Sequence, residues 1–149
     1  MARRIEIQIE GAQAPFTLLE ELTPKSGAAL WESLPIEGSI RHGKWSGEAC
    51  YLMVDRGPLA ELSDQLELAV ASIYRGYLVV VPSASPGHAE LLLSYGTAES
   101  RTVTGRRYAT PLAELEGDGS ALFDVLRRTQ LEGEKKVVIR QTDGRTGEE

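Results

Sequence analysis

The sequence predicts a mainly β protein, a closed β-barrel with one or two short helices. Three observations lead to this fold class. Apolar and polar residues alternate in many short segments, as they do in strands that bury one face. Glycine or proline separates most of these segments, which is typical of turns. Helical signals are few, so a barrel is favoured over a layered parallel sheet, in which helices connect successive strands.

The first half of the chain combines strand signals with one helix signal. Ile5, Ile7 and Ile9 alternate with polar residues and predict an opening strand, which a turn at 11–14 joins to a second strand. Thr23 and Pro24 form a helix start signal, with Thr23 as the expected capping side chain. The elements expected in this half are strands at 5–10 and 16–22, a helix at 24–34, and strands at 39–42 and 48–55.

The second half repeats the strand signals and contains one further helix. Residues 59–71 fit both a helical and an extended pattern, so their structure stays open. The elements expected after them are strands at 77–81 and 89–95, an edge strand at 102–108, a helix at 120–126 and a strand at 137–139. Residues 1–142 are expected to form a single domain, and residues 143–149 a frayed polar tail.

Composition argues against several classes of partner. The formal net charge of −6 opposes phosphate backbones, and no basic run offsets it, so nucleic acid is not expected as a partner. The chain has one cysteine and therefore no internal disulfide. The residues at 1–6 do not predict a signal peptide, and no apolar run is long enough to predict a membrane span. The expected location is the cytoplasm. No phosphate-binding glycine motif is present, and we expect no cofactor.

Two segments carry a family resemblance. The stretches His-Gly-Lys-Trp-Ser-Gly-Glu-Ala at 42–49 and Ala-Glu-Leu-Leu-Leu-Ser-Tyr-Gly at 89–96 resemble, in their order and separation, a bacterial family of unknown function with a cyclophilin-like fold. The segment at 23–35 is similar to the helix that plugs barrels of this superfamily. The resemblance implies a cyclophilin-like closed barrel. The catalytic arginine pattern of true cyclophilins is not retained at 40–44, so the resemblance leaves enzymatic activity open.

Five residues form the predicted binding site: His42, Trp45, Glu48, Glu90 and Tyr95. Trp45 and Tyr95 would supply apolar walls, because small-molecule pockets are lined mainly by aromatic and apolar side chains. The imidazole and the two carboxylates would orient a ligand, with amines as a suitable class. The alternative for each is structural: a hydrogen-bonded histidine, a tryptophan over the barrel end, and solvated acids at strand edges.

Other constellations have weaker support. His42, His88 and Glu90 have the residue types of a two-histidine, one-carboxylate metal site, but no diagnostic spacing, so no metal is predicted. Cys50 lies in mid-strand among apolar residues and is expected to be a buried thiol.

The first functional hypothesis is a module that binds a small molecule or short peptide. The alternatives are a divergent prolyl isomerase or other enzyme using His42, and a structural or interaction protein with a filled barrel. A strand edge at 102–108 suggests a homo-oligomer.

Overall fold

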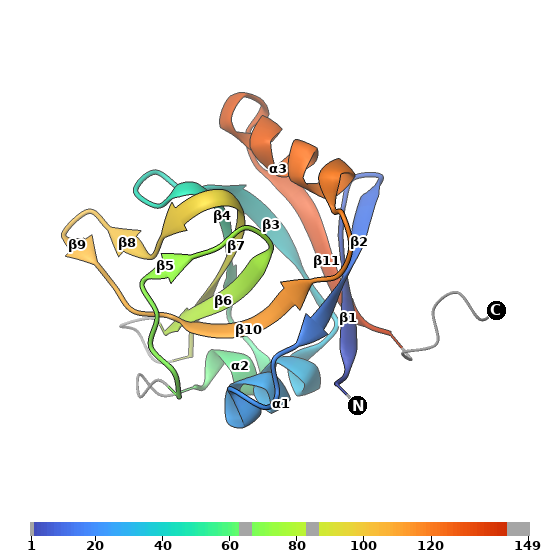
Figure 1. Ribbon diagram of the computed structural model, residues 1–149, viewed down its shortest axis with the longest axis vertical. Helices are drawn as coiled ribbons and strands as arrows, with labels where there is room; N and C mark the ends of the chain where they lie inside the picture. The colour runs from blue at the N-terminus through green and yellow to red at the C-terminus, as the bar shows by residue number, and fades with distance from the viewer. Residues whose placement is uncertain (1, 63–66, 83–86, 143–149) are drawn as a thin grey trace.

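The protein is a closed antiparallel barrel in the computed structural model, which describes residues 2–62, 67–82 and 87–142 (Figure 1). The barrel strands are, in chain order, β1 (Arg4–Ile9), β2 (Ala12–Leu18), β3 (Ile36–His42), β4 (Gly47–Val54), β6 (Tyr77–Pro82), β7 (Ala89–Glu99), β10 (Thr110–Leu115) and β11 (Lys135–Gln141). They neighbour one another in the order β4-β3-β11-β1-β2-β10-β6-β7, and the pairing of β7 with β4 closes the ring. The predicted mainly β class and closed barrel are confirmed. The cyclophilin-like character stays a prediction.

Helices lie at both ends of the barrel. Figure 1 shows α3 (Ser120–Glu132) at one end, and α1 (Pro24–Ser33) with the short α2 (Gly57–Ala60) at the other. Outside the ring, β5 (Ser72–Ile73) pairs with the end of β7, and β8 (Arg101–Thr102) with β9 (Gly105–Arg106) forms a projecting hairpin. None of the helices in the described ranges has the length and apolarity that crossing a bilayer requires.

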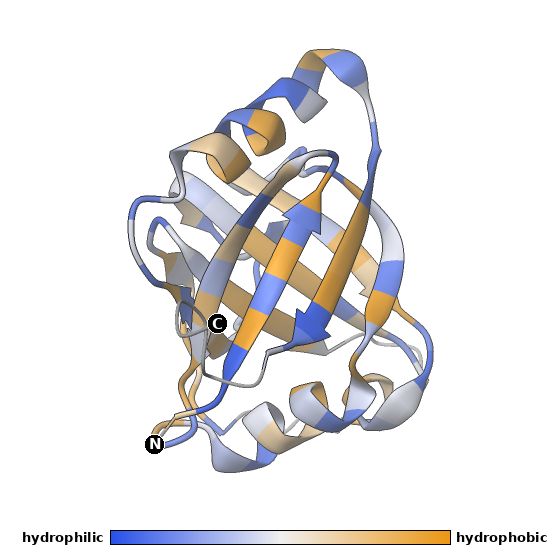
Figure 2. Cartoon of the chain, turned by 90° about the vertical axis from the view of Figure 1, so that its right-hand side faces the viewer, coloured by the Kyte–Doolittle hydropathy of each residue, from blue (hydrophilic) through white to orange (hydrophobic). Residues whose placement is uncertain are grey.

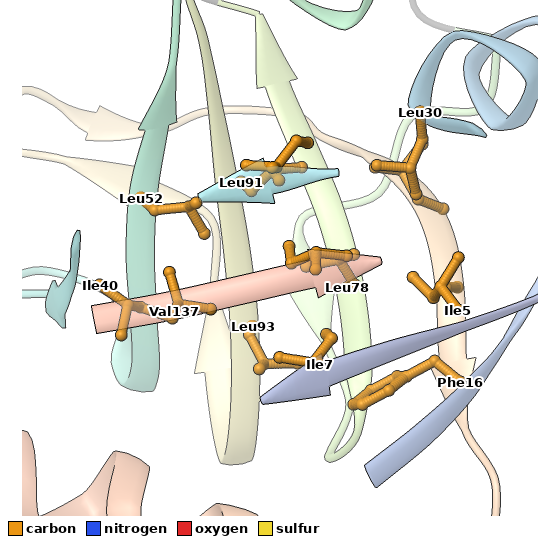
Figure 3. Packing of buried hydrophobic residues seen from close by; sticks show 14 of the residues in the cluster. Ile5, Ile7, Phe16, Leu30, Ile40, Leu52, Leu78, Leu91, Leu93 and Val137 are labelled. Atoms are coloured by element: carbon orange, nitrogen blue, oxygen red, sulfur yellow. The ribbon is translucent and has the colours of Figure 1, made fainter. Parts of the chain in front are cut away.

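Hydrophobic side chains fill the barrel interior. Ile5, Ile7 and Ile9 are at most 1% exposed, and they point inward because alternate residues of a strand share a face. The alternating stripes along the strands are visible in Figure 2. Figure 3 shows side chains from strands across the barrel meeting in the interior, together with a leucine of α1; the labelled ones are Ile5, Ile7, Phe16, Leu30, Ile40, Leu52, Leu78, Leu91, Leu93 and Val137.

One wall of the barrel is also buried on its outer face. Val79, Val81 and Leu92 point outward from β6 and β7 and pack with Ile73 of β5 and with Ala109 in a second apolar cluster. A strand buried on both faces needs a continuous apolar run rather than an alternating one. This explains the runs Tyr-Leu-Val-Val-Val at 77–81 and Leu-Leu-Leu at 91–93.

The structure corrects several expected elements. The opening turn is tighter than expected, so β2 begins at Ala12 and ends at Leu18. β7 continues past Gly96 to Glu99, since the ladder with β4 is irregular between Ser94 and Ala98, around this glycine, and resumes at Ala98. Strand β10 was not expected at all, and Pro111 lies in it beside a register shift, where a missing amide is tolerated. The expected edge strand at 102–108 is instead the β8–β9 hairpin.

The N-terminus of α1 is capped by a residue distant in sequence. Thr23, the expected cap, donates its hydroxyl to the carbonyl oxygen of Pro111 at 2.8 Å and makes no cap bond. Instead, the carboxylate of Glu67 accepts the backbone amides of Lys25 at 2.9 Å and Ser26 at 2.6 Å. Partial burial acts to raise the pKa of Glu67, but these hydrogen bonds outweigh it and lower the pKa.

We expect Glu67→Gln to lower the free energy of unfolding by about 0.5–1.5 kcal/mol at neutral pH, because the variant loses a charged cap at a helix N-terminus. The pKa of Glu67 is lower in the folded state, so its contribution is complete above the ordinary glutamate value of about 4.3 and is lost as the pH falls through the folded pKa. Urea denaturation of both proteins between pH 3 and 7 measures this difference.

The matched control is Glu21→Gln, which removes the same charge from an exposed position. It should change the free energy of unfolding by less than about 0.5 kcal/mol. Equal losses in the two variants, or a Glu67 effect that persists below pH 3, would contradict a role for the Glu67 carboxylate at the start of α1.

Candidate functional site

His42 and Tyr95 meet at the end of the barrel that α3 covers. His42 is the last residue of β3 and shares the inward face with Ile40, while Tyr95 follows Leu93 on the inward face of β7. The two rings contact edge to face, with centroids 5.7 Å apart. Two of the five predicted site residues are therefore in direct contact.

A directed chain of hydrogen bonds joins these residues to α3. The Nδ1 atom of His42 lies 2.8 Å from the carbonyl oxygen of Gly43, which can only accept, so Nδ1 carries the proton. In the neutral ring Nε2 is then an acceptor, and the Tyr95 hydroxyl donates to it at 2.7 Å. The side-chain amide of Gln130 donates to the Tyr95 oxygen at 2.9 Å and lies 3.1 Å from Nε2. We name His42, Tyr95 and Gln130 the polar cluster.

The surroundings of Tyr95 keep its phenol protonated. Burial is the main cause that raises the pKa of Tyr95, and the charge of Glu48 adds to it, whereas Gln130 and Arg127 oppose the rise. The guanidinium carbon of Arg127 lies 5.2 Å from the centre of the tyrosine ring. A neutral phenol can donate to His42 throughout the physiological pH range, which stabilises the direction of the hydrogen-bond chain.

Beneath α3, Cys50 forms a second polar contact with the helix. Its thiol is fully buried, 3.3 Å from the hydroxyl of Thr129 and 3.5 Å from the carbonyl oxygen of Leu126. Burial raises the pKa of the Cys50 thiol to about 11, although the hydrogen bond with Thr129 opposes the rise. This agrees with the expected buried thiol, which at neutral pH is not the reactive thiolate.

A shallow hollow lies beside the polar cluster, and we name it the His42 hollow. Its volume is about 430 Å³, and its lining includes Arg41, His42, Lys44, Thr129, Gln130 and Glu134. Arg41 forms an ion pair with Glu134 across it. Within the described ranges Lys44 has no ion pair. The hollow therefore presents an available ammonium group next to a hydrogen-bonded imidazole and amide.

Trp45 and Glu48 lie outside this hollow. Trp45 is in the loop between β3 and β4, is 52% exposed, and is not among the residues that line the His42 hollow. The Glu48 carboxylate accepts the backbone amide of Thr97 at 2.8 Å and borders a separate hollow of about 450 Å³. Glu48 lies directly over Gly96, where any side chain would collide with it. The charge of Glu48 contributes to the raised pKa of Tyr95, but its carboxylate is hydrogen-bonded to the backbone of β7.

Glu90 and His88 are not part of the polar cluster. Glu90 is an odd number of residues from Tyr95, so it lies on the outer face of β7, where burial raises its pKa and the charge of Arg107 opposes the rise. His88 directly precedes β7, seven residues before Tyr95, and lies near the other end of the barrel, roughly 24 Å from Tyr95 at about 3.4 Å per residue. The structure therefore does not bring Glu90 together with His42. No group of three or more metal-ligating side chains occurs among the described residues.

Sequence reasoning missed Gln130, Arg127 and Thr129 because the second helix was expected to end at Leu126. The structure extends α3 to Glu132. A signal was present, since Leu122, Leu126 and Thr129 continue the buried helical stripe at spacings of four and three residues. Because Thr129 is polar, the apolar pattern alone did not predict the second half of the helix.

Comparison with known proteins supports the fold and leaves the function open. Residues 5–69 match the model of a family described as a protein of unknown function, DUF3830. This supports the resemblance to a family of unknown function, while the cyclophilin-like character, the tryptophan motif as its signature and a bacterial origin stay predictions. No curated protein matches the chain.

Two solved structures share the fold. One is the protein McbB, solved in complex with tryptophan, with a TM-score of 0.73 and 21% identity over 93% of this chain and 45% of McbB. The chain thus spans about half the length of McbB. The other is a hypothetical protein, AF2241 from Archaeoglobus fulgidus, with a TM-score of 0.61 and 16% identity over 95% of each chain. At these identities the likeness concerns the fold alone.

Proposed function

We propose that this protein is a binding module for a small molecule that carries a carboxylate or phosphate group, held in the His42 hollow. The observation that supports the proposal is the polar cluster beside an available ammonium group. Lys44 would pair with the anionic group of the ligand, and Gln130 and the edge of the His42 ring would orient the rest.

The packed barrel interior supports a surface site. Ile5, Phe16 and Leu78 are fully buried in the barrel core, so a ligand inside the barrel would have to displace core side chains. The hollow at the α3 end needs no such displacement. The anionic ligand class replaces the amines expected from sequence, because Glu48 and Glu90 lie outside the hollow while Arg41 and Lys44 border it.

Binding is favoured over catalysis by the state of the polar cluster. The lone pair of His42 Nε2 already accepts from Tyr95, and the Tyr95 side chain is only 2% exposed. A general base must reach the proton that it removes, and here the basic nitrogen is already hydrogen-bonded within the protein. An enzyme using His42 would first have to break this bond.

The experiment is a thermal-shift screen with small carboxylates, inorganic phosphate, amines and tryptophan, the last because McbB, which shares the fold, was solved with it. A ligand present at 100 times its dissociation constant stabilises the folded state by about 2.7 kcal/mol. We expect anionic compounds to raise the melting temperature of wild type. Lys44→Gln should reduce the shift by weakening ligand binding.

Lys136→Gln is the matched control, because it removes the same charge from an exposed position on β11. It should leave the ligand shift of wild type intact. The proposal fails if no anionic compound stabilises wild type, or if Lys44→Gln and Lys136→Gln reduce the shift equally. A protein that responds to none of these compounds would favour the second candidate function, an interaction or structural role, which the filled barrel supports.

A further inference from the structure

The ladder between β3 and β4 has the fewest register partners in the barrel ring. Only Arg41 with Tyr51 and His42 with Cys50 are register partners there. By contrast, β4 has seven register partners on β7, and β3 has five on β11. Ile36–Ile40 of β3 and Leu52–Val54 of β4 have no register partners on each other, whereas β3 is paired with β11 and β4 with β7 on their other sides. We name this unpaired stretch the seam.

The register shows which main-chain groups face this seam. Gly43 donates its amide to the carbonyl oxygen of Ala49, so alternate residues of β3 counted back from Gly43 direct their amides and carbonyls toward β4. Counting back along β3 from Arg41, the next two residues with this orientation are Ser39 and Glu37. If the register of the Arg41–Tyr51 pair continued without a break, their partners on the β4 side would be Met53 and Asp55. In the described part of the chain, no backbone pairing joins them.

A cavity of about 890 Å³ lies at the same place, within the range of ligand pockets. Its lining includes Pro35, Glu37, Met53, Asp55, Arg56 and His88. Met53 is 49% exposed and offers an apolar contact. Arg56 lies 3.7 Å from Asp55, so these two charges offset each other. Glu37 has no ion pair within the described ranges, and its negative charge is therefore the one left unbalanced at the seam.

We propose that the seam is a docking site for an extended segment of a partner protein, which adds as a strand between β3 and β4. Main-chain groups of Glu37 and Ser39 on one side and of Met53 and Asp55 on the other would form the ladder. Unpaired strand edges recruit strands in this way, and two facing edges can pair both sides of one segment. The negative charge selects a segment with lysine or arginine, and Met53 selects an apolar neighbour.

This site is independent of the His42 hollow. The hollow lies under α3, whereas the seam opens toward the end of the barrel with α1 and α2, where Ser33 at the end of α1 also borders the cavity. Variants at Ser39 and Glu37 therefore test the seam without touching the lining of the hollow.

The test is selection of a random hexapeptide library, displayed on phage, against the full-length protein. We expect enrichment of peptides that alternate apolar and basic residues. Ser39→Pro removes one seam-facing amide while leaving the ladder with β11 intact, and should weaken binding about tenfold or more. Ser39→Ala keeps the amide and removes only the hydroxyl, so its affinity should stay within about threefold of wild type.

Amide NMR spectra of each variant establish that it is folded before affinities are compared. If Ser39→Pro does not fold, Glu37→Lys replaces it and should shift the selected peptides from basic to acidic residues. Peptide binding should change the amide signals of Glu37, Ser39, Met53 and Asp55. Failure of any peptide to enrich would overturn the proposal, as would equal affinity for Ser39→Pro and Ser39→Ala or signal changes confined to other surfaces.

Discussion

Phe16→Ala is expected to lower the free energy of unfolding by about 3–5 kcal/mol, the range for deleting a buried aromatic ring. Phe16 lies on β2, is fully buried in the barrel interior, and is directly opposite Ile5 in the ladder. The loss includes the transfer free energy of the ring and the cost of the cavity left behind, because neighbouring strands of a closed barrel cannot collapse freely. Urea denaturation followed by circular dichroism measures it.

Leu131→Ala provides the control, since Leu131 is 94% exposed and should change the free energy of unfolding by less than about 0.5 kcal/mol. The comparison also tests whether the interior is a packed core or a ligand chamber. A chamber already contains empty volume, so removing one wall residue would cost less. If Phe16→Ala lowers the free energy of unfolding by less than about 1.5 kcal/mol, the interior is not a packed core, and the barrel interior becomes the favoured ligand site.

The barrel class could be predicted from sequence because its signal is local. Alternation at Ile5, Ile7 and Ile9 determines an inward face whichever strands are neighbours. The missed strand β10 shows the limit of this signal. Pro111 argues locally against a strand, and only the register shift between Pro111 and Ala113 accommodates it. Such a bulge is a property of the pairing with β6, and pairing partners cannot be deduced from one segment.

The candidate site was predicted in part for the same reason. His42 and Tyr95 were both proposed, and each lies on the inward face at the same end of its strand, so closing the barrel brings them together. Glu90 was grouped with Tyr95 from proximity in sequence, although residue parity already assigned the two to opposite faces of β7. Gln130 required knowledge of where α3 lies on the barrel, which is a tertiary property.

Thr110→Val is expected to raise the free energy of unfolding by about 1–3 kcal/mol. Thr110 is 1% exposed, and its hydroxyl is the one buried side-chain polar atom without a hydrogen-bond partner among the described residues. It pairs with Val80, an inward-facing core residue, so the hydroxyl is directed into an apolar interior. An unsatisfied buried hydroxyl carries its full desolvation cost, and valine removes it with nearly the same shape.

Thr129→Val makes the same exchange at a buried hydroxyl that has partners. The Thr129 hydroxyl donates to the carbonyl oxygen of Leu126 at 2.6 Å and contacts the Cys50 thiol, so this variant should lose about 0.5–1.5 kcal/mol. Identical chemistry should therefore give opposite signs at two buried threonines, measured by urea denaturation under one set of conditions. Destabilisation by Thr110→Val as large as that by Thr129→Val would mean that the Thr110 hydroxyl is hydrogen-bonded in the folded protein, and that the barrel interior admits a polar partner at this point.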